Sequence, residues 1–353
     1  MKAEASVDGS MGSPDMHKVI LVNGPDLHPD AVQMIASRGY EVVYTPAYAD
    51  SDILNAALRE TGAAGMVSRL GRISAEALRD APALRVISKH GAGVDNIDVA
   101  GASALDIAVL AASGANAVSV AEHAIALLLA TVKRIVPLDA GLRAGRWEKP
   151  GFLGRELAGS TIAFIGMGAI AQATARMASG FGLKAVGYDP FASDVDFEAL
   201  GVTRVASVEG ALSGADIVSL HCPLTPETNC LLNAERIALM RPGSYVVNTA
   251  RGGLIDEEAL VAAIRSGHLA GAGLDTFAVE PPAVDHPFWA EPNIVVSPHI
   301  GGVTREAGAR VGTEAVRGIF QILDGEPIEA RRVVNRSALK TPPHMLETKE
   351  NRS

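Results

Sequence analysis

The sequence predicts an α/β protein with two doubly wound parallel-sheet domains, and three observations support this prediction. Short β-branched runs alternate with alanine-rich stretches of helical period, which is the pattern of strands joined by crossover helices. Most of the runs are almost continuously apolar, as expected for parallel strands that helices bury on both faces. The 353 residues are also enough for two domains, each with its own core.

The predicted strands fall into two series along the chain. The first series contains Lys18–Val22, Glu41–Tyr44, Gly65–Val67, Arg85–Ser88 and Ile107–Leu110. The second contains Thr161–Ile165, Ala185–Tyr188, Ile217–Leu220, Tyr245–Asn248, Gly271–Leu274 and Ile294–Val296. Each series is expected to form one sheet, because consecutive strands usually lie side by side.

The connection between the two sheets is expected near Ser113–Val118. Directly after it, the segment Ser119-Val120-Ala121-Glu122 has the S-x-x-E form of a capping box. This motif predicts an apolar helix that starts there and continues to about Arg134. A later helix, Thr304–Leu323, is expected to return the chain to the first domain.

These connections predict a discontinuous first domain, residues 17–115 and 300–335, into which residues 116–299 are inserted. Two lobes joined by two crossings would form a hinged cleft, a common place for a ligand. Residues 1–16 and 336–353 are predicted to be flexible ends without a role in chemistry. The first of these ends lacks the apolar core of a signal peptide.

Composition and charge argue against several classes of partner. The formal net charge of −9 disfavours nucleic acid and anionic membrane surfaces, because binding to either relies on a surplus of Lys and Arg. The longest apolar run, Ala124–Val132, is too short for a bilayer, which needs about 20 residues. Cys222 and Cys230 form no disulfide framework and have no metal-ligand spacing, so we expect a cytoplasmic protein without a metal.

A dinucleotide site is predicted where the Thr161–Ile165 strand ends, because the next six residues have the form G-x-G-x-x-A. Gly166 permits the tight turn, Gly168 lets the backbone approach a pyrophosphate, and the small Ala171 allows close packing of helix on strand. The phosphates would lie on free amides at the start of the following helix. The segment Gly91–Gly93 and the segment Gly271–Gly273 lack this full context.

Asp189 supports this site, because it follows directly after the next strand. Its spacing in sequence from Gly166 is close to the about 20 residues expected for a carboxylate that binds the adenosine ribose. The alternative is that Asp189 is simply a turn residue before Pro190. No arginine follows Asp189 to receive a 2′-phosphate. The sequence therefore favours NAD over NADP.

Three later strand ends carry candidate catalytic residues: Arg251, Glu280 and His299. Loops at the carboxyl ends of parallel strands form the ligand crevice, so these side chains are expected to converge. Histidine can donate a proton near neutral pH, and a neighbouring carboxylate favours its charged form. A guanidinium can hold a substrate carboxylate and polarise a carbonyl group. This chemistry suits reduction of a 2-oxo acid.

With these motifs the chain resembles the D-isomer-specific 2-hydroxyacid dehydrogenases, and among them it is most similar to the D-3-phosphoglycerate dehydrogenases. The resemblance extends from about His17 to Asn335 and rests on the segments Gly166–Ala171, Val246–Gly253, Gly271–Asp275 and Pro298–Gly302. It implies a Rossmann NAD domain inserted into a flavodoxin-like substrate domain. It also implies an NAD-dependent dehydrogenase that interconverts a D-2-hydroxy acid and its 2-oxo acid.

The resemblance further implies a role for individual residues. Arg251 would bind the substrate, His299 would be the acid/base with Glu280 as its partner, and Asp275 would contact the nicotinamide carboxamide. Other cofactor contacts are expected from Gly166, Gly168, Ala169, Ile170, Asp189, Cys222, Pro223, Thr228, Thr249, Ala250, Gly301 and Gly302. Substrate contacts are expected from Lys89, Gly91, Ala92 and Gly93, and from Arg69 if it meets Lys89.

The substrate itself stays open, because Lys89 stands where similar enzymes often have arginine. A pair of 3-phosphoglycerate and phosphohydroxypyruvate, or a similar acidic pair, is one interpretation, and a hydroxypyruvate or glyoxylate reductase is the alternative. A distant alternative is an NAD-sensing, corepressor-like binding protein. Formate dehydrogenase is disfavoured, because that family pairs its histidine with glutamine, whereas Glu280 stands here.

Three smaller expectations complete the interpretation. The segment Ala124–Trp147 resembles the dimer-forming arm of the family, which implies a homodimer. The resemblance ends soon after Asn335, so we expect a short form without a C-terminal regulatory domain. His123 is expected to pack in a core or a subunit interface, and His221 to support its loop.

Overall fold

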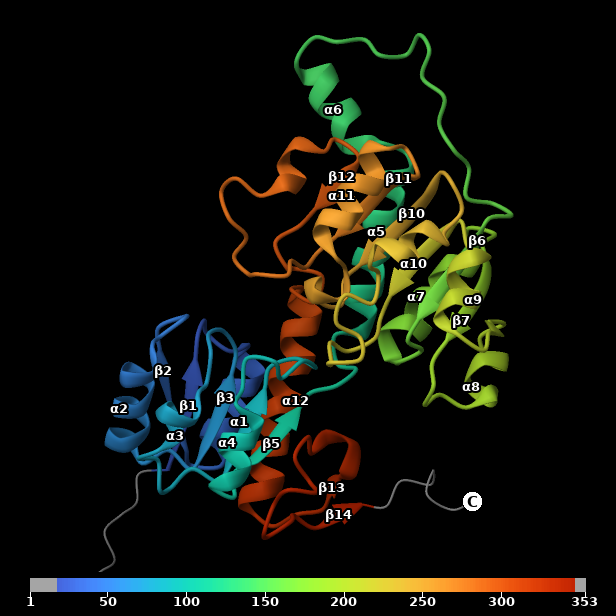
Figure 1. Ribbon diagram of the computed structural model, residues 1–353. Helices are drawn as coiled ribbons and strands as arrows, with labels where there is room; N and C mark the ends of the chain where they lie inside the picture. Colours follow the sequence, from blue (N-terminus) through green and yellow to red (C-terminus); the bar gives the residue numbers. More distant parts are fainter. Residues whose placement is uncertain (1–17, 347–353) are drawn as a thin grey trace, which may run out of the picture. The chain divides into compact units, whose positions relative to one another are not determined.

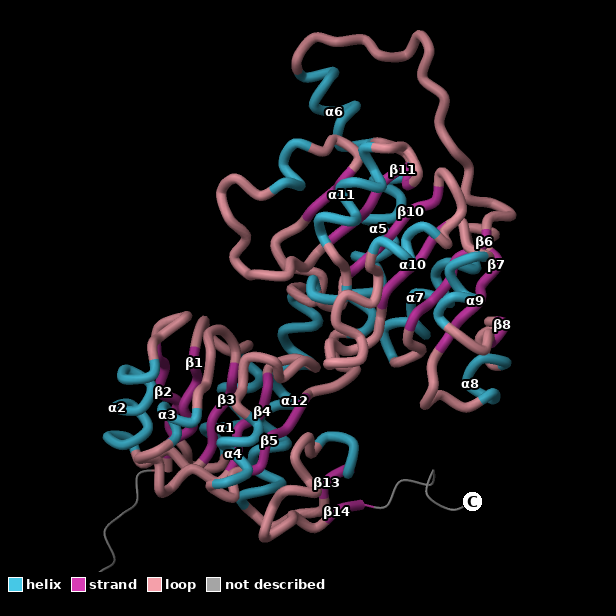
Figure 2. The backbone as a smooth tube through the Cα atoms, in the orientation of Figure 1, coloured by secondary structure: helices cyan, strands magenta, loops and turns pink. Residues whose placement is uncertain are grey.

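The structure is a computed structural model that describes residues 18–346 (Figure 1). The described chain divides into two compact units, which are residues 18–113 with 308–346, called unit 1, and residues 114–307, called unit 2. The predicted leader, residues 1–16, lies outside the described residues. The alternation of strands and helices in each unit can be followed in Figure 2.

Unit 1 contains a parallel five-stranded sheet of order β2-β1-β3-β4-β5, which is the flavodoxin-like order. Its strands are β1 (Val19–Asn23), β2 (Glu41–Thr45), β3 (Gly65–Ser68), β4 (Val86–Lys89) and β5 (Ala108–Ala111). Its helices are α1 (Pro29–Ser37), α2 (Ser51–Thr61), α3 (Ala75–Leu78), α4 (Val99–Ala104) and most of α12 (Arg305–Leu323). Helices α1 and α12 bury one face of this sheet, and α2, α3 and α4 bury the other.

Unit 2 contains a parallel seven-stranded sheet of order β12-β11-β10-β9-β6-β7-β8. Its strands are β6 (Thr161–Ile165), β7 (Lys184–Tyr188), β8 (Thr203–Arg204), β9 (Ile217–Leu220), β10 (Ser244–Asn248), β11 (Leu269–Leu274) and β12 (Ile294–Val296). The strand order reverses between β6 and β9, as in Rossmann sheets.

Helices cover both faces of the second sheet. Helices α5 (Ala117–Val132) and α7 (Ala169–Ser179) pack on one face. Helices α9 (Val208–Ser213), α10 (Ala234–Ala238) and α11 (Glu257–Arg265) pack on the other. Shorter elements are α6 (Ile135–Arg143), α8 (Asp194–Glu198) and the 3-10 turns Gly252–Leu254 and Pro287–Ala290. The predicted architecture of two doubly wound parallel sheets is therefore confirmed.

Two glycines of β11 have a packing role that the sequence did not suggest. A Cβ added to Gly271 would lie 2.9 Å from Thr131 Cγ2, and one added to Gly273 would lie 2.9 Å from Leu127 Cβ. Both contacts are with helix α5. The absence of side chains at these two positions thus lets α5 lie directly against the strand.

The capping box predicted at Ser119 is wrong. Helix α5 begins two residues earlier, at Ala117, and its N-cap residue Asn116 makes no side-chain capping bond. Ser119 instead lies inside the helix, where its hydroxyl is 2.9 Å from the hydroxyl of Thr304. The local S-x-x-E pattern was present, but a contact with a residue far along the chain determines what Ser119 does.

The tail predicted to be flexible from residue 336 is also ordered over its first part. The strand β14 (Met345–Leu346) pairs in parallel with β13 (Ile328–Glu329), and a 3-10 turn, Ala330–Arg332, follows β13. Leu339 and Met345 pack against the core of unit 1. Buried Asn335 accepts a hydrogen bond from the amide of Val109 and donates to the carbonyl of Ile107. Asn335, directly before this tail, thus binds the edge strand of the first sheet, and the tail itself packs on unit 1.

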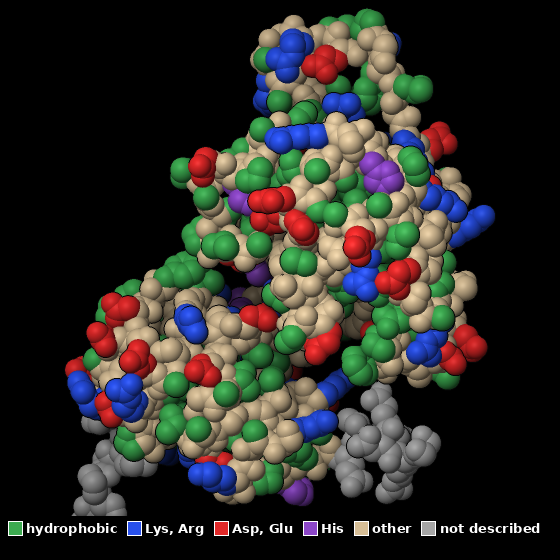
Figure 3. Space-filling model, in the orientation of Figure 1, with side chains coloured by type: hydrophobic (Ala, Val, Ile, Leu, Met, Phe, Trp, Pro, Cys, Tyr) green, Lys and Arg blue, Asp and Glu red, His purple; other side chains and the backbone are tan. Residues whose placement is uncertain are grey.

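Surface and helix properties agree with the composition. On the face drawn in Figure 3, acidic and basic side chains are interspersed rather than gathered into one basic area. None of the helices between residues 18 and 346 has the length and apolar character needed to cross a membrane.

Candidate active site

The candidate active site lies at the carboxyl edge of the sheet of unit 2. All seven strands of this sheet run parallel, so their carboxyl ends, and the loops that follow them, share one edge. The predicted glycine turn follows β6, and the predicted catalytic residues follow β10, β11 and β12. The topology therefore brings these segments to the same side of the sheet, as open α/β sheets do for ligands.

The glycine turn lies at the point where the strand order reverses. Gly166 has a φ of 93°, and a Cβ there would lie 2.8 Å from the amide nitrogen of Cys222 in the loop after β9. By contrast, a Cβ on Gly168 would meet nothing within 4 Å. Gly168 is the N-cap of α7 and provides no side-chain capping bond. The turn thus leaves open space before the uncapped N-terminus of a helix, which fits a dinucleotide pyrophosphate.

Asp189 contacts the glycine turn directly. One carboxylate oxygen accepts a hydrogen bond of 2.8 Å from the amide of Met167, and the other accepts from the amides of Phe191 and Ala192. The predicted position beside the turn and the alternative role as a turn residue are thus both present. A carboxylate has about four acceptor sites, so Asp189 retains capacity for a ribose hydroxyl.

His299 and Glu280 form a close pair. The Nδ1 atom of His299 lies 2.7 Å from Oε2 of Glu280, while Oε1 of Glu280 accepts a hydrogen bond from the amide of Phe277. The His299 side chain is 46% exposed, and with Nδ1 at the carboxylate, Nε2 is the ring nitrogen left for a substrate. Burial alone would raise the pKa of Glu280, but the bonds from His299 and Phe277 and the positive charges of His299 and Arg251 hold that pKa below its usual value.

Arg251 is placed by a polar loop after β10. The side chain of buried Asn248 accepts a hydrogen bond from the amide of Ala250 and donates to the carbonyl of Arg251, which fixes the turn between them. The guanidinium donates to the carbonyl of Ala250 at 2.6 Å. Its positive charge also contributes to the lowered pKa of Glu280, so Arg251 and the His299–Glu280 pair act on one another.

Asp275 is buried and accepts several hydrogen bonds from the protein, while its expected contact with the nicotinamide carboxamide stays a prediction. Its side chain is 2% exposed, and its oxygens accept hydrogen bonds from the Ser297 hydroxyl and from the amides of Ile300 and Gly301. Burial would raise the pKa of Asp275, but His123 and these three donors keep it lowered. The carboxylate therefore holds the loop that carries His299.

His123 and Ser297 belong to this network, and sequence reasoning missed both. His123 Nε2 lies 2.7 Å from the Ser297 hydroxyl and 3.3 Å from Asp275, so this side chain makes polar contacts in addition to the packing expected of it. A signal for Ser297 existed: Leu274 of β11 pairs with Val296 of β12, so the residues that follow them, Asp275 and Ser297, are neighbours. No local pattern pointed to His123.

Among the remaining predicted cofactor residues, Cys222 lies next to the glycine turn. Burial raises the pKa of the Cys222 thiol to about 11, so the thiol is neutral near pH 7. The Thr228 hydroxyl donates to the carbonyl of Pro223 and shapes the loop after β9. The Thr249 hydroxyl is buried without a hydrogen-bond partner among the described residues, and a bound dinucleotide could supply one. His221 is held by Ser219 at 2.8 Å, consistent with support of its loop.

In unit 1, Lys89 and Arg69 do lie together. The Nζ atom of Lys89 donates to the carbonyl of Arg69 at 3.0 Å and to the Oδ1 atom of Asn96 at 2.8 Å. The guanidinium of Arg69 donates to the carbonyls of Pro25 and Asp26. Burial, together with the charges of Arg69 and Lys89, lowers the pKa of the adjacent His90 to about 4. The predicted loop Gly91–Gly93 follows directly.

Comparison with known proteins identifies the class. Residues 125–301 match the NAD-binding domain of the D-isomer specific 2-hydroxyacid dehydrogenases, and the chain belongs to this family.

No group of three or more His, Cys, Asp or Glu side chains within residues 18–346 is placed to hold a metal ion.

Two relatives and one solved structure illustrate the similarity. A D-3-phosphoglycerate dehydrogenase of Mycobacterium bovis is 42% identical over 78% of this chain and 52% of its own length, so the chain spans about half of that relative. A hydroxypyruvate reductase of Thermotoga maritima is 38% identical over 86% of this chain and 97% of its own length. A protein from Thermus thermophilus, known from a crystal structure, is 38% identical in sequence and superposes with a TM-score of 0.79. The match covers 87% of this chain and 97% of the Thermus thermophilus chain.

Proposed function

We propose that this protein is an NAD-dependent oxidoreductase that interconverts a D-2-hydroxy acid and its 2-oxo acid. The observation that carries the proposal is the His299–Glu280 pair, 2.7 Å apart, at the same sheet edge as the glycine turn. An acid/base group and a dinucleotide site at one edge are the two parts that such a reaction requires.

The chemistry follows from these side chains. NADH, when bound, supplies the hydride that reaches C2 of the 2-oxo acid. The carbonyl oxygen gains negative charge as this happens, and His299 donates a proton to it from Nε2. Glu280 stabilises the charged imidazole and fixes the ring through Nδ1. Arg251 holds the substrate carboxylate and offsets the developing charge through charged hydrogen bonds.

The cofactor role of Gly166, Gly168 and Asp189 is supported by the geometry of the turn. The open space before α7 admits phosphates, and the Asp189 carboxylate beside Met167 suits ribose hydroxyls better than a 2′-phosphate. The roles assigned to Ala169, Ile170, Ala250, Gly301 and Gly302 rest on the family resemblance.

For the substrate, we propose a 2-oxo acid with a second anionic group, such as phosphohydroxypyruvate. The proximity of Lys89 and Arg69 in unit 1 supports this choice, because their combined positive charge favours a second anion. The second candidate is a reductase of hydroxypyruvate, which the near full-length match to the Thermotoga maritima enzyme favours. We assign substrate recognition in unit 1 to Lys89, Arg69 and the loop Gly91–Gly93.

The experiment that tests the function measures kcat/KM with NADH for phosphohydroxypyruvate, hydroxypyruvate and glyoxylate. We expect turnover of all three and a preference of about tenfold or more for the phosphorylated acid, as charged hydrogen bonds imply. Equal values would favour the simple reductase. Binding of NADH without turnover of any acid would instead support a sensor-like binding protein.

A second measurement tests the pairing itself. Glu280→Gln keeps an acceptor near Nδ1 but removes the charge that favours the protonated ring. Reduction needs the protonated ring, so the alkaline limb of the pH–rate profile should move down by about one pH unit. A profile that overlays the wild type would contradict the assigned role of Glu280.

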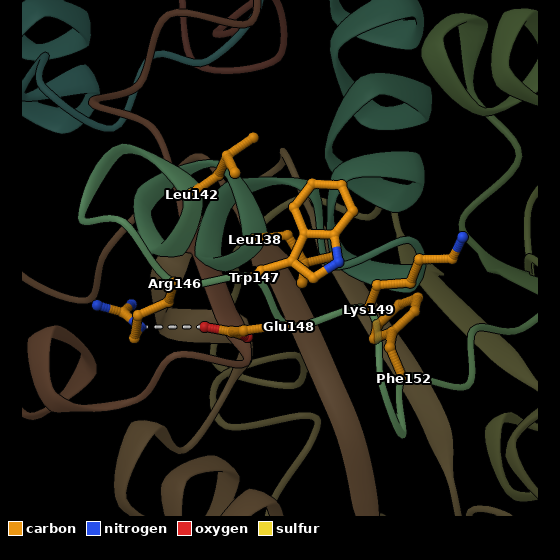
Figure 4. Close-up of a pocket in the computed structure, with 7 residues that line it drawn as sticks. All are labelled: Leu138, Leu142, Arg146, Trp147, Glu148, Lys149 and Phe152. Atoms are coloured by element: carbon orange, nitrogen blue, oxygen red, sulfur yellow. Dashed lines mark hydrogen bonds and ion pairs between the residues drawn. The ribbon is translucent and has the colours of Figure 1, made fainter.

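We also propose a cytoplasmic homodimer in which the segment from α6 to Leu153, called the arm, lies between subunits. The arm exposes large apolar side chains, with Trp147 70% and Leu153 94% exposed. Leu138, Leu142, Trp147 and Phe152 also line a hollow in the arm (Figure 4). Exposed apolar patches of this kind commonly mark interfaces. Light scattering should give the mass of two chains, and Leu142→Asp with Leu153→Asp should give that of one.

A further inference from the structure

We propose that His123 is a positioning residue for His299 and acts on it through Ser297 and Asp275. The inference rests on the proposed function, in which His299 transfers the proton. All four residues lie in unit 2. Three of them, His123, Ser297 and Asp275, form a hydrogen-bonded network beneath the loop that carries the fourth.

The loop is clamped on both sides of His299 by one carboxylate. Before His299, the hydroxyl of Ser297 donates to Oδ1 of Asp275 at 2.6 Å. After His299, the amide of Ile300 donates to the same oxygen at 2.9 Å, and the amide of Gly301 donates to Oδ2 at 2.7 Å. The position of His299 is therefore determined by the position of a buried group that is not itself part of the His299–Glu280 pair.

The hydrogen bonds of Asp275 hold His299 in an unfavourable backbone conformation. His299 has a φ of 55°, in the left-handed region that a residue with a Cβ rarely adopts. Such a conformation persists only where surrounding bonds hold it. A looser clamp would let the backbone relax, and the imidazole would then leave the direction that points Nδ1 at Glu280.

His123 is the hydrogen-bond donor in its contact with Ser297. The lowered pKa of Asp275 means that its carboxylate is ionised near neutral pH and only accepts hydrogen bonds. The single proton of the Ser297 hydroxyl therefore points to Asp275, 2.6 Å away. The contact of 2.7 Å between Ser297 Oγ and His123 Nε2 then requires that His123 donates. His123 must carry a proton on Nε2, and it orients the hydroxyl that holds the loop.

The packing around His123 keeps it at this place. Helix α5 lies against β11 because Gly271 and Gly273 have no side chains. A Cβ on Gly301 would lie 2.9 Å from Asp275 Oδ2 and 3.3 Å from the His123 ring, so the loop also fits closely over the imidazole. The close fit on both sides holds the ring against the loop.

The test compares three variants. His123→Leu removes the donor, and His123→Gln places an amide donor near the position of Nε2. His268→Leu is the matched control, since the His268 side chain is also partly buried and makes one hydrogen bond, to the carbonyl of Ile237, but His268 precedes the opposite end of β11. We expect His123→Leu to lower kcat about tenfold with little change in KM, as loss of a buried hydrogen bond implies. His123→Gln should recover most of kcat, and His268→Leu should keep it.

A second readout does not depend on turnover. Hydrogen exchange of the amides of Ile300 and Gly301 reports the clamp directly, and His123→Leu should speed it about tenfold while His268→Leu leaves it unchanged. Unchanged exchange in His123→Leu, or equal kcat losses in His123→Leu and His268→Leu, would overturn the proposal. Failure of His123→Gln to recover kcat would overturn the donor assignment. If the wild type reduces no 2-oxo acid, the proposed function fails, and the exchange rates alone still decide whether His123 holds the loop.

Discussion

Each of the two parallel sheets has one point where its strand order reverses, and the two points differ in what their loops do. In unit 1 the reversal lies between β1 and β3. There, the side chain of Asn23 donates to the carbonyl of Leu70 and accepts from the amide of Arg69, so the two loops are tied to each other. In unit 2 the reversal lies between β6 and β9, and the space before Gly168 and the start of α7 is open.

The two units therefore suit different tasks. In unit 1 the side chains of Lys89 and Arg69 donate to backbone carbonyls, so we expect them to act on a ligand mainly through their charge. In unit 2 the hydrogen bonds of Asp275 hold the loop that carries His299, and Nδ1 of His299 contacts Glu280, which leaves Nε2 for the proposed proton transfer. Similar topologies therefore support a charged surface in one unit and an acid/base group in the other. Variants of the His299 site in unit 2 should lower kcat, and variants of Lys89 in unit 1 should alter the preference between substrates.

The largest effect is expected from His299→Ala. Removal of the positioned proton donor should lower kcat about 10²–10⁴-fold, because general acid catalysis contributes that much. His268→Ala is the control, since His268 lies before the other end of β11. Steady-state kinetics with NADH and the preferred acid measures both. A loss of less than tenfold in His299→Ala would mean that another group supplies the proton.

Stability should fall in acid because each unit contains a partly buried histidine with a low pKa, His90 in unit 1 and His221 in unit 2. Burial, then the charge of Arg69 and that of Lys89, lowers the pKa of His90 to about 4, while burial alone lowers that of His221 to about 4. Between pH 6.5 and 4 the unfolded chain binds these protons and the folded chain does not. The stabilisation is fully present above pH 6.5 and is lost as the pH falls to about 4, by about 3 kcal/mol for each histidine.

Salt should distinguish the two histidines. Screening weakens the contribution of the Arg69 and Lys89 charges to His90, but leaves the burial of His221 unchanged. NMR titration of the two rings in low and high salt should therefore move the His90 midpoint upward and leave the His221 midpoint in place. Equal movement of both midpoints would contradict the stated causes.

A smaller effect is expected from Lys89→Met, which tests recognition in unit 1. Loss of the ammonium should reduce the preference for phosphohydroxypyruvate over hydroxypyruvate by about tenfold, the size of one charged hydrogen bond. The ratio of the two kcat/KM values measures it. A matched control is Arg59→Met, which removes a charge from the end of α2 in the same unit. An equal change of the ratio in both variants would remove Lys89 from substrate recognition.

The smallest effect is expected from Asp189→Ala. The variant removes the carboxylate that we propose accepts ribose hydroxyls and repels a 2′-phosphate, so NADH should bind several-fold more weakly and the preference for NADH over NADPH should narrow. Fluorescence titration of both cofactors gives the two dissociation constants. An unchanged ratio between them would mean that another residue selects the cofactor.

The sequence was sufficient to predict those strands and turns for which the local residue pattern and the sheet topology agree. The eleven strands were predicted because short, nearly continuous apolar runs between turns mark buried parallel strands, and the glycine turn because its spacing is fixed by phosphate geometry. The strand Thr203–Arg204 was missed because two exposed residues carry no periodicity. The bonds of Ser119 to Thr304 and of His123 to Ser297 join residues more than 170 positions apart, and no local pattern encodes such contacts.

The way Asn335 and α12 complete unit 1 has a consequence for how the chain folds during synthesis. Much of the core over one face of the first sheet comes from Val316, Ile319 and Phe320 of α12, and the β5 edge is finished by Asn335. Ribosomes add about 5–20 residues per second, so the first five strands wait some tens of seconds for these partners. Unit 2, residues 114–307, is continuous in sequence and has all its strands before then. The unit that is made first is thus the unit that finishes folding last.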